Sequence, residues 1–219
     1  MHTHYSLSIR HGRLRFLTGI VTGALLALGL GCRPGNDGAR STGYRGTVLP
    51  QARDKVEFTL TDTQGEPFDF VEQTAGFVTL VFFGYTYCPD ICPIHMANIG
   101  TVLKGLPFEL RQQIKVIFIT TDPDRDTRQR LRTWLDNFDA SFIGLRGTQE
   151  EVNEIAVSLG LPPSVKLENE EGGYEVGHSA YVMAFTKDDR AHVIYGFGTR
   201  QADWSHDLLK LVSETWDAE

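Results

Sequence analysis

The sequence predicts an α/β protein in which helices flank a central mixed β-sheet. Two runs of strand length, "GFVTLVFFGY" (76–85) and "IKVIFITTD" (114–122), are apolar almost throughout, as strands buried on both faces are. Segments with helical spacing follow each run. A length of 219 residues, 41% of them hydrophobic, suits one domain. The net charge of −7, with no basic face after residue 56, argues against a nucleic-acid partner.

The first predicted elements are an opening strand and hairpin, from the alternation in "VEFTLTD" (56–62) and the short run "FDF" (68–70). The strand over 76–85 comes next, then a helix in "MANIGTVLKGL" (96–106) and the strand over 114–122. A helix in "DTRQRLRTWLDNFD" (126–139) has Asp126 or Thr127 as its N-cap. We expect parallel pairing with right-handed crossovers for these strands.

The second half of the chain continues with a short strand, "FIGLRG" (142–147), and a capped helix, "TQEEVNEIAVSLG" (148–160). A polar excursion (162–178) precedes two runs joined by a charged turn (179–198), which predict a hairpin, and a closing helix (204–216). A β-α-β-α-β-α unit completed by a hairpin and a helix is a thioredoxin-like sandwich, with its own N-terminal hairpin.

The first 32 residues differ from the rest of the chain. Three arginines precede an apolar run (16–30), which is typical of an export signal. Cys32, preceded by Gly31, resembles the lipobox of bacterial lipoproteins, in which the thiol is acylated. An uncleaved membrane anchor and a free secreted protein are the alternatives, and each places the domain outside the cytoplasm. Residues 33–53 are predicted to be a flexible linker, and residues 54–219 form the domain.

Two of the three cysteines, Cys88 and Cys92, directly follow the strand over 76–85. Active crevices of open α/β sheets lie beyond the carboxyl ends of the strands. Pro93 suits a first helical turn, so we expect a helix to begin there with Cys92 at its N-terminus. The positive end of a helix favours the thiolate, which is the form that exchanges disulfides and binds metals.

Three interpretations of this cysteine pair remain open on the residues alone. A structural disulfide would close a very short loop and stabilise little. A redox pair would resemble the C-x-x-C of disulfide oxidoreductases with one residue more. A metal site with two soft thiolates would suit Cu(I) or Zn(II), and needs further ligands.

Histidines are the natural source of a further ligand. His2, His4 and His11 belong to the predicted signal. His95, His192 and His206 are expected on the surface. His178 lies between the Gly-rich excursion and an apolar strand, where a loop could fold back over the carboxyl edge of the sheet.

Three separated motifs, "GYTYCPDICP", "TTDPDRDT" and "VGHSAYV", closely resemble those of the Sco/SenC proteins. These are thioredoxin-fold copper proteins that assist cytochrome c oxidase assembly. The resemblance spans roughly residues 54–216 and implies that Cys88, Cys92 and His178 bind one copper ion, as Cu(I) or Cu(II). It also implies that the two cysteines can form a redox-active disulfide. Tyr87 replaces the histidine often found before the first cysteine.

The resemblance implies a copper metallochaperone for the dinuclear copper centre of the oxidase. The alternative is a thiol:disulfide oxidoreductase that reduces the cysteines of that centre, so whether the protein is an enzyme stays open. The expected partners are the oxidase subunit that carries the copper centre and another copper chaperone or a thiol reductase. The expected location is the bacterial cell envelope, tethered on the periplasmic side. Asp122, in the family's Asp-Pro motif, is expected to support the metal ligands by hydrogen bonding or charge.

Overall fold

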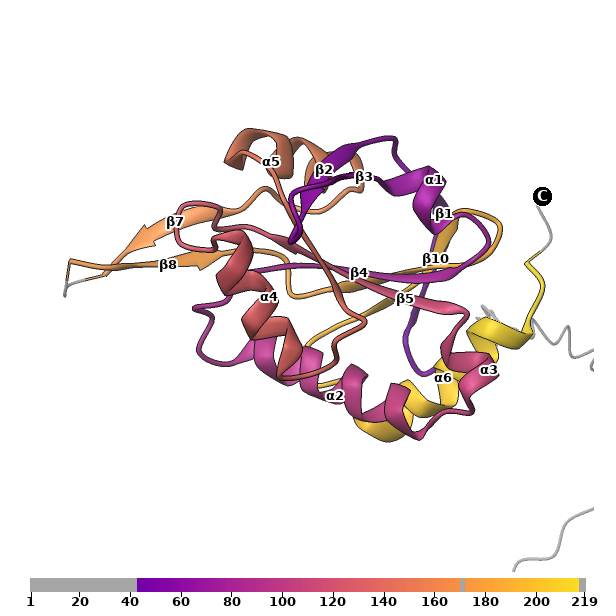
Figure 1. Cartoon of the computed structure of the whole chain (residues 1–219). Helices are drawn as coiled ribbons and strands as arrows, with labels where there is room; N and C mark the ends of the chain where they lie inside the picture. The colour runs from indigo at the N-terminus through magenta and orange to yellow at the C-terminus, as the bar shows by residue number, and fades with distance from the viewer. Residues whose placement is uncertain (1–42, 170–171, 217–219) are drawn as a thin grey trace, which may run out of the picture. The chain divides into compact units, whose positions relative to one another are not determined.

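The computed structural model describes residues 43–169 and 172–216 of the chain. Eight strands form one sheet in the order β1-β10-β9-β4-β5-β6-β2-β3, and two more form a separate hairpin, β7–β8 (Figure 1). The strands are β1 (Thr47–Asp54), β2 (Thr59–Asp62), β3 (Pro67–Asp69), β4 (Val78–Gly84), β5 (Ile114–Thr120), β6 (Ile143–Arg146), β7 (Val165–Glu168), β8 (Tyr174–Gly177), β9 (Val182–Phe185) and β10 (Arg190–Tyr195).

Within the described residues, six helices connect or follow these strands. They are α1 (Phe70–Thr74), α2 (Ile91–Gly105), α3 (Phe108–Arg111), α4 (Arg128–Asp136), α5 (Gln149–Ser158) and α6 (Gln201–Ser213). Thr127 is the N-cap of α4, and Thr148 begins α5 with a capping box. Both caps satisfy backbone N–H groups that the first helical turn leaves without partners.

The centre of the sheet is the parallel trio β4, β5 and β6, and β9 lies antiparallel against the other side of β4. All seven residues of β4 are buried, as expected for a strand covered on both faces. Because side chains alternate along a strand, Leu80 and Phe82 point to one core layer while Val81 and Phe83 point to the other. The predicted mixed sheet flanked by helices, with an N-terminal hairpin (β2–β3), is confirmed.

The two core layers are covered by different helices. Helices α2, α4 and α6 cover the first layer, and α1 and α5 cover the second (Figure 1). The first layer holds Trp204 and Leu208 of α6 against Tyr195 of β10. It also holds Cys92 and Met96 of α2, so the helix that carries the second cysteine is anchored in the core.

Two segments differ from the sequence-based prediction. Residues 47–53, predicted as part of a flexible linker over 33–53, belong to β1 (Thr47–Asp54), which pairs with β10. Their strand pattern is masked by Pro50 and by the polar residues that follow it. Residues 165–168 and 174–177, predicted as a polar excursion, form the β7–β8 hairpin beside the sheet. The predicted signal or anchor over 1–32, with Cys32, lies outside the described residues.

The start of the described chain is held by Asp207, a fully buried carboxylate on α6. Its oxygens accept hydrogen bonds from the backbone N–H groups of Arg45 and Gly46 at 2.8 to 3.0 Å. Charge-assisted bonds of this kind are among the stronger ones in proteins. No helix within residues 43–169 and 172–216 is both long and apolar enough to cross a membrane.

Candidate metal centre

The candidate centre lies where β4 ends and α2 begins. Gly84, the last residue of β4, leaves room for the Cys92 side chain: a Cβ atom at this position would lie 2.8 Å from Cys92 Sγ and 3.0 Å from the ring of Phe118. Real Cβ contacts are essentially never that close. Any larger residue at position 84 would therefore force the Cys92 side chain or the strand to shift.

The loop between β4 and α2 is short and internally bonded. The Cys88 N–H donates to the carbonyl of Tyr85 at 3.2 Å. Helix α2 begins at Ile91, two residues before the predicted start at Pro93, so both Cys92 and Pro93 lie in its first turn. The backbone N–H of Cys92 points at Cys88 Sγ, 3.5 Å away. The first turn of α2 thus donates a backbone hydrogen bond to the sulfur of Cys88.

The structure brings Cys88, Cys92 and His178 together. Their ligand atoms all lie within 4.8 Å of one another, and Cys92 Sγ is 3.6 Å from His178 Nε2. Cys88 and Cys92 are both free thiols, the first half-buried and the second completely buried. This is the only such group of metal-ligating side chains among the described residues. The three predicted ligands therefore converge on one point.

The pKa of Cys92 shifts in the direction opposite to that predicted from its place at the start of a helix. A hydrogen bond from the Cys92 thiol, together with those from the backbone N–H groups of Cys92 and Asp90, lowers the pKa of Cys88 to about 3. Burial, followed by the hydrogen bond to Cys88, raises the pKa of Cys92. Placement at a helix N-terminus does not offset the loss of water around Cys92. Cys88 is the thiolate of the pair.

The imidazole of His178 is oriented with one nitrogen free for the site. Its Nδ1 lies 2.8 Å from the carbonyl oxygen of Ser179. Because a carbonyl oxygen can only accept, Nδ1 carries the proton and Nε2 presents a lone pair to the thiols. The rings of Phe82 and Tyr85 meet the imidazole edge-on at 5.9 and 5.6 Å between centroids. This is the tautomer that a metal-binding histidine needs.

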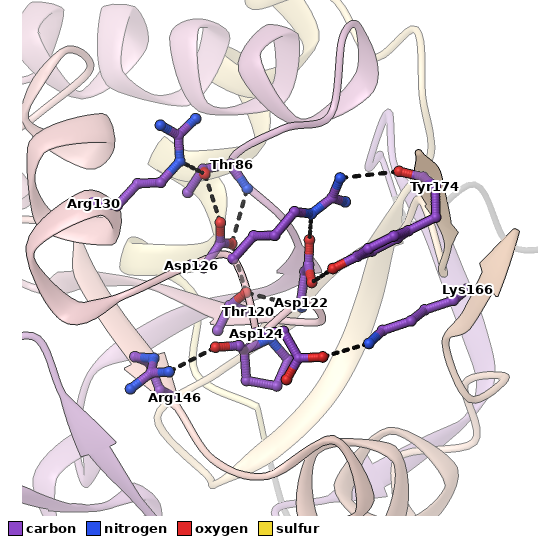
Figure 2. A network of polar contacts seen from close by, with 11 residues as sticks. Thr86, Thr120, Asp122, Asp124, Asp126, Arg130, Arg146, Lys166 and Tyr174 are labelled. Atoms are coloured by element: carbon purple, nitrogen blue, oxygen red, sulfur yellow. Dashed lines mark hydrogen bonds and ion pairs between the residues drawn. The ribbon is translucent and has the colours of Figure 1, made fainter. Parts of the chain in front are cut away.

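Asp126, considered from sequence only as a helix cap, is instead buried behind the cysteine loop. Its carboxylate accepts hydrogen bonds from the N–H of Thr86 at 2.9 Å and from the hydroxyls of Thr86 and Thr120 at 2.6 Å each (Figure 2). Burial raises the pKa of Asp126. Because Thr86 stands two residues before Cys88, this carboxylate fixes the path of the loop that carries the first ligand.

Asp122, predicted to support the ligands, is buried but makes no direct hydrogen bond to them among the described residues. It pairs with Arg125 and accepts a hydrogen bond from the Tyr174 hydroxyl at 2.9 Å (Figure 2). Arg125 also donates to the carbonyl of Tyr174 and stacks on its ring at 3.7 Å. Asp122 thus connects the loop after β5 to β8, the strand that leads into His178.

The other histidines of the domain have different roles. His192 pairs with Asp188 and stacks on Trp216, and His206 donates to Asp207. His95, predicted to be exposed, is only 2% exposed. It lies on α2 one turn after Cys92, with its Nε2 3.1 Å from the carbonyl oxygen of Ala180. Helical periodicity placed it on a face that the His178 loop covers, which the local sequence does not reveal.

The donor set itself indicates which metal would fit. Two cysteine sulfurs and one imidazole nitrogen are soft to borderline ligands, which favour Cu(I) and can also hold Cu(II). Structural zinc usually takes four protein ligands, and the described residues provide three. Because Nε2 of His178 carries a lone pair and the Cys88 pKa lies far below neutrality, two of the three donors are ready to bind without losing a proton.

The fold and the site together define a thioredoxin-like protein whose two thiols share their crevice with a metal-ligating histidine. The family model SCO1/SenC matches residues 47–213, and the chain belongs to this family. A candidate copper-binding protein of Stutzerimonas stutzeri is 38% identical over 148 residues, covering 67% of this chain and 72% of that protein. Matches to the first three curated relatives span 51% to 72% of their length.

Two solved structures extend the comparison. Apo Sco1 of Thermus thermophilus has a TM-score of 0.68 and 30% identity, and the match covers 77% of this chain and 96% of that one. ScoI of Bradyrhizobium japonicum, solved with copper bound, has a TM-score of 0.64 and 29% identity, over 73% and 99% of the two chains. The thioredoxin-like fold and the family resemblance inferred from the three motifs are confirmed.

Proposed function

We propose that this protein is a copper metallochaperone that assists assembly of the dinuclear copper centre of cytochrome c oxidase. The observation that carries the proposal is the convergence of two sulfurs and one imidazole nitrogen within 4.8 Å. Membership of the SCO1/SenC family and the copper-bound structure of the Bradyrhizobium relative support copper as the cargo.

The geometry suits transfer as well as retention. Cys88 is half-buried at the surface of the site, whereas Cys92 is enclosed by the core. A three-coordinate ion leaves room for one more ligand, so a thiolate of the receiving protein can enter beside Cys88. The ion then passes on by ligand exchange, with no net change in its oxidation state. His178, which comes from a loop, is the ligand expected to leave first.

The alternative function, thiol:disulfide exchange, has its own supporting observation. The pKa of Cys88 is lowered to about 3, and this thiol is more exposed than its neighbour. Such a thiolate can attack a partner disulfide to give a mixed disulfide, from which Cys92 releases the reduced partner and forms the Cys88–Cys92 disulfide. In each cycle two electrons pass from this protein to the partner. The reaction uses Cys88 and Cys92 as the catalytic pair and does not need His178.

Metal analysis separates the two functions. The protein is purified without oxygen, loaded with Cu(I) and dialysed, and copper per chain is measured before and after oxidation. One copper per chain, with sulfur-to-Cu(II) charge-transfer absorption on oxidation, is expected for the chaperone. The oxidoreductase would instead be favoured by two results together: the metal-free protein reduces a partner disulfide, and the protein retains no copper whether its two cysteines are reduced or oxidised.

The location follows from family and sequence. We propose a bacterial cell-envelope protein, tethered to the membrane with its domain on the periplasmic side, with acylation of Cys32 as the means of attachment. The proposed partner is the oxidase subunit that carries the copper centre, with a second copper chaperone or a thiol reductase upstream. Mass spectrometry of the mature N-terminus tests the acylation directly.

A further inference from the structure

The buried side chain of His95 joins helix α2, which carries Cys92, to the loop that carries His178. His95 lies on α2, three residues after Cys92, and its Nε2 is 3.1 Å from the carbonyl oxygen of Ala180, two residues after His178. A carbonyl oxygen only accepts, so Nε2 of His95 carries the proton and donates it. The imidazole is 2% exposed. Besides the contact of Cys92 Sγ with His178 Nε2 at 3.6 Å, this is the one side-chain bond from α2 to residues 178–181 in the part of the chain that the structure describes.

The surroundings of His95 fix its ring. It lies against Phe82 of β4 at 5.1 Å between centroids and against Phe197 at 6.3 Å. Phe82 is also the ring that meets His178 edge-on. The two imidazoles therefore pack around one phenylalanine, and the bond to Ala180 closes the arrangement across the loop.

The loop that carries His178, residues 178–181, makes two side-chain hydrogen bonds within itself. His178 Nδ1 bonds within the loop, to Ser179, and the Tyr181 N–H bonds to the Ser179 hydroxyl at 3.3 Å. Both bonds stabilise the internal shape of the loop and neither attaches it to the rest of the molecule. Two contacts join the loop to α2: the 3.6 Å contact between Cys92 Sγ and His178 Nε2, and the shorter bond from His95 to the Ala180 carbonyl at 3.1 Å.

We propose that His95 is a positioning residue that sets the distance between the imidazole of His178 and the thiols by anchoring the Ala180 carbonyl to α2. His95 does not itself touch the metal. The inference rests on the proposed copper function for its consequence, which is slower loss of copper, but the anchoring is a property of the metal-free protein. Without the anchor, His178 would still be present yet would spend less time within reach of Cys92.

Three variants of the full chain test the proposal. In His95→Gln the amide nitrogen stands close to where Nε2 stood and can still donate. In His95→Leu a side chain of similar bulk has no donor. Asn98→Leu, one turn further along α2, removes a 3.5 Å bond to the carbonyl of Thr199 and the acceptor of Gln201, both of which lie outside the His178 loop. Thermal unfolding first establishes that each variant is folded.

The first measurement needs no metal. In the reduced apo protein, the NMR cross-peak between the ring protons of His178 and the β-protons of Cys92 is expected in the wild type, in His95→Gln and in Asn98→Leu. It is expected to weaken several-fold in His95→Leu. An unchanged cross-peak in folded His95→Leu would overturn the proposal, and so would an equal loss in Asn98→Leu.

The second measurement uses copper. Release of Cu(I) to a chelator is expected to be about fivefold faster from His95→Leu than from the wild type, which corresponds to the loss of about 1 kcal/mol for one hydrogen bond. The His95→Gln rate should stay near that of the wild type. Equal release rates for His95→Leu and the wild type would contradict the proposal. A wild type that retains no copper would refute the chaperone function, while the metal-free measurement still decides the role of His95.

Discussion

His178 Nε2 lies 3.6 Å from Cys92 Sγ, although the two residues are 86 positions apart in the chain. The contact exists because β9, which begins just after His178, pairs with β4, which ends just before the cysteine loop. The fold thus delivers a nitrogen to a site whose two sulfurs come from one local segment.

Replacing His178 by alanine is expected to abolish tight Cu(II) binding and to leave the thiol pair functional. Loss of an outer hydrogen-bond partner of a metal ligand already costs about 10- to 100-fold in affinity, so loss of the ligand itself should exceed that range. Copper stoichiometry and charge-transfer absorption measure the first effect, and titration of a reducible disulfide measures the second. Unchanged copper binding would disprove the three-ligand site. His206→Ala, which removes an exposed imidazole from α6, is the control.

Alkylation should distinguish the two thiols by pH. Because the pKa of Cys88 is lowered to about 3 and that of Cys92 is raised, Cys88 is a thiolate throughout the range from pH 5 to 8 and Cys92 is not. Iodoacetamide should modify Cys88 at a nearly constant rate across this range and leave Cys92 largely unmodified. Peptide mass spectrometry after quenching gives both rates. A Cys88 rate that rises tenfold for each pH unit would mean an ordinary thiol pKa.

Gly84→Ala should damage the site through space alone. The added methyl group would stand 2.8 Å from Cys92 Sγ, so the thiol or the strand must move. Overpacking of this kind costs about 1 to 3 kcal/mol, and we expect both a lower unfolding free energy and weaker Cu(I) retention. Gly105→Ala is the control, because a Cβ there meets nothing within 4 Å. If Gly84→Ala bound copper like the wild type, the close packing of Gly84 against Cys92 would not matter for copper binding.

Asp126→Ala should loosen the cysteine loop. The substitution leaves the Thr86 N–H and two buried hydroxyls without their acceptor, at a cost of about 3 kcal/mol. Urea unfolding measures the loss, and the alkylation rate of Cys88 reports on the loop. Asp124→Ala, two residues earlier, removes only an exposed ion pair with Lys166 and should change stability little. Equal effects of the two substitutions would show that burial of Asp126 does not matter.

The stability of the fold should decrease in mild acid because of His95. Burial lowers the pKa of this imidazole, so below about pH 6.5 the unfolded chain binds a proton that the folded protein does not. Protons therefore favour unfolding as the pH falls from 6.5 towards the folded pKa. The urea midpoint of the wild type should drop more between pH 7.5 and 5.5 than that of His95→Gln. Identical drops would assign the acid sensitivity to other groups.

The sequence predicted the sheet and the three ligands for reasons that are local. Runs such as that ending at Gly84 are apolar on both faces, and cysteines after such a strand belong at its carboxyl end. His178 was found by its place before an apolar strand and by the family motif. The strand β1 was missed because an edge strand needs only half-buried residues, and its pattern of exposed and partly buried side chains resembles that of a linker.

What the sequence did not reveal depends on contacts between distant segments. Whether His95 faces water is decided by the loop around Ala180, 85 positions away. The prediction of a lowered Cys92 pKa was wrong because it was argued from the helix N-terminus, while burial of Cys92 is set by the whole core layer. The role of Asp126 likewise depends on a distant residue, Thr86, which follows β4 and lies 40 positions earlier in the chain. Asp122 remains a prediction as a supporting residue.

The anchoring of Arg45 and Gly46 to Asp207 has a mechanical consequence. A force applied along the chain before residue 43 meets this buried carboxylate first and passes into α6, which is seated in the core through Trp204 and Leu208. The cysteine loop leads into α2, so this load reaches it only through the packing of α2 against α6. With the membrane attachment proposed above, tension on the chain would act on α6 before it acts on the metal ligands.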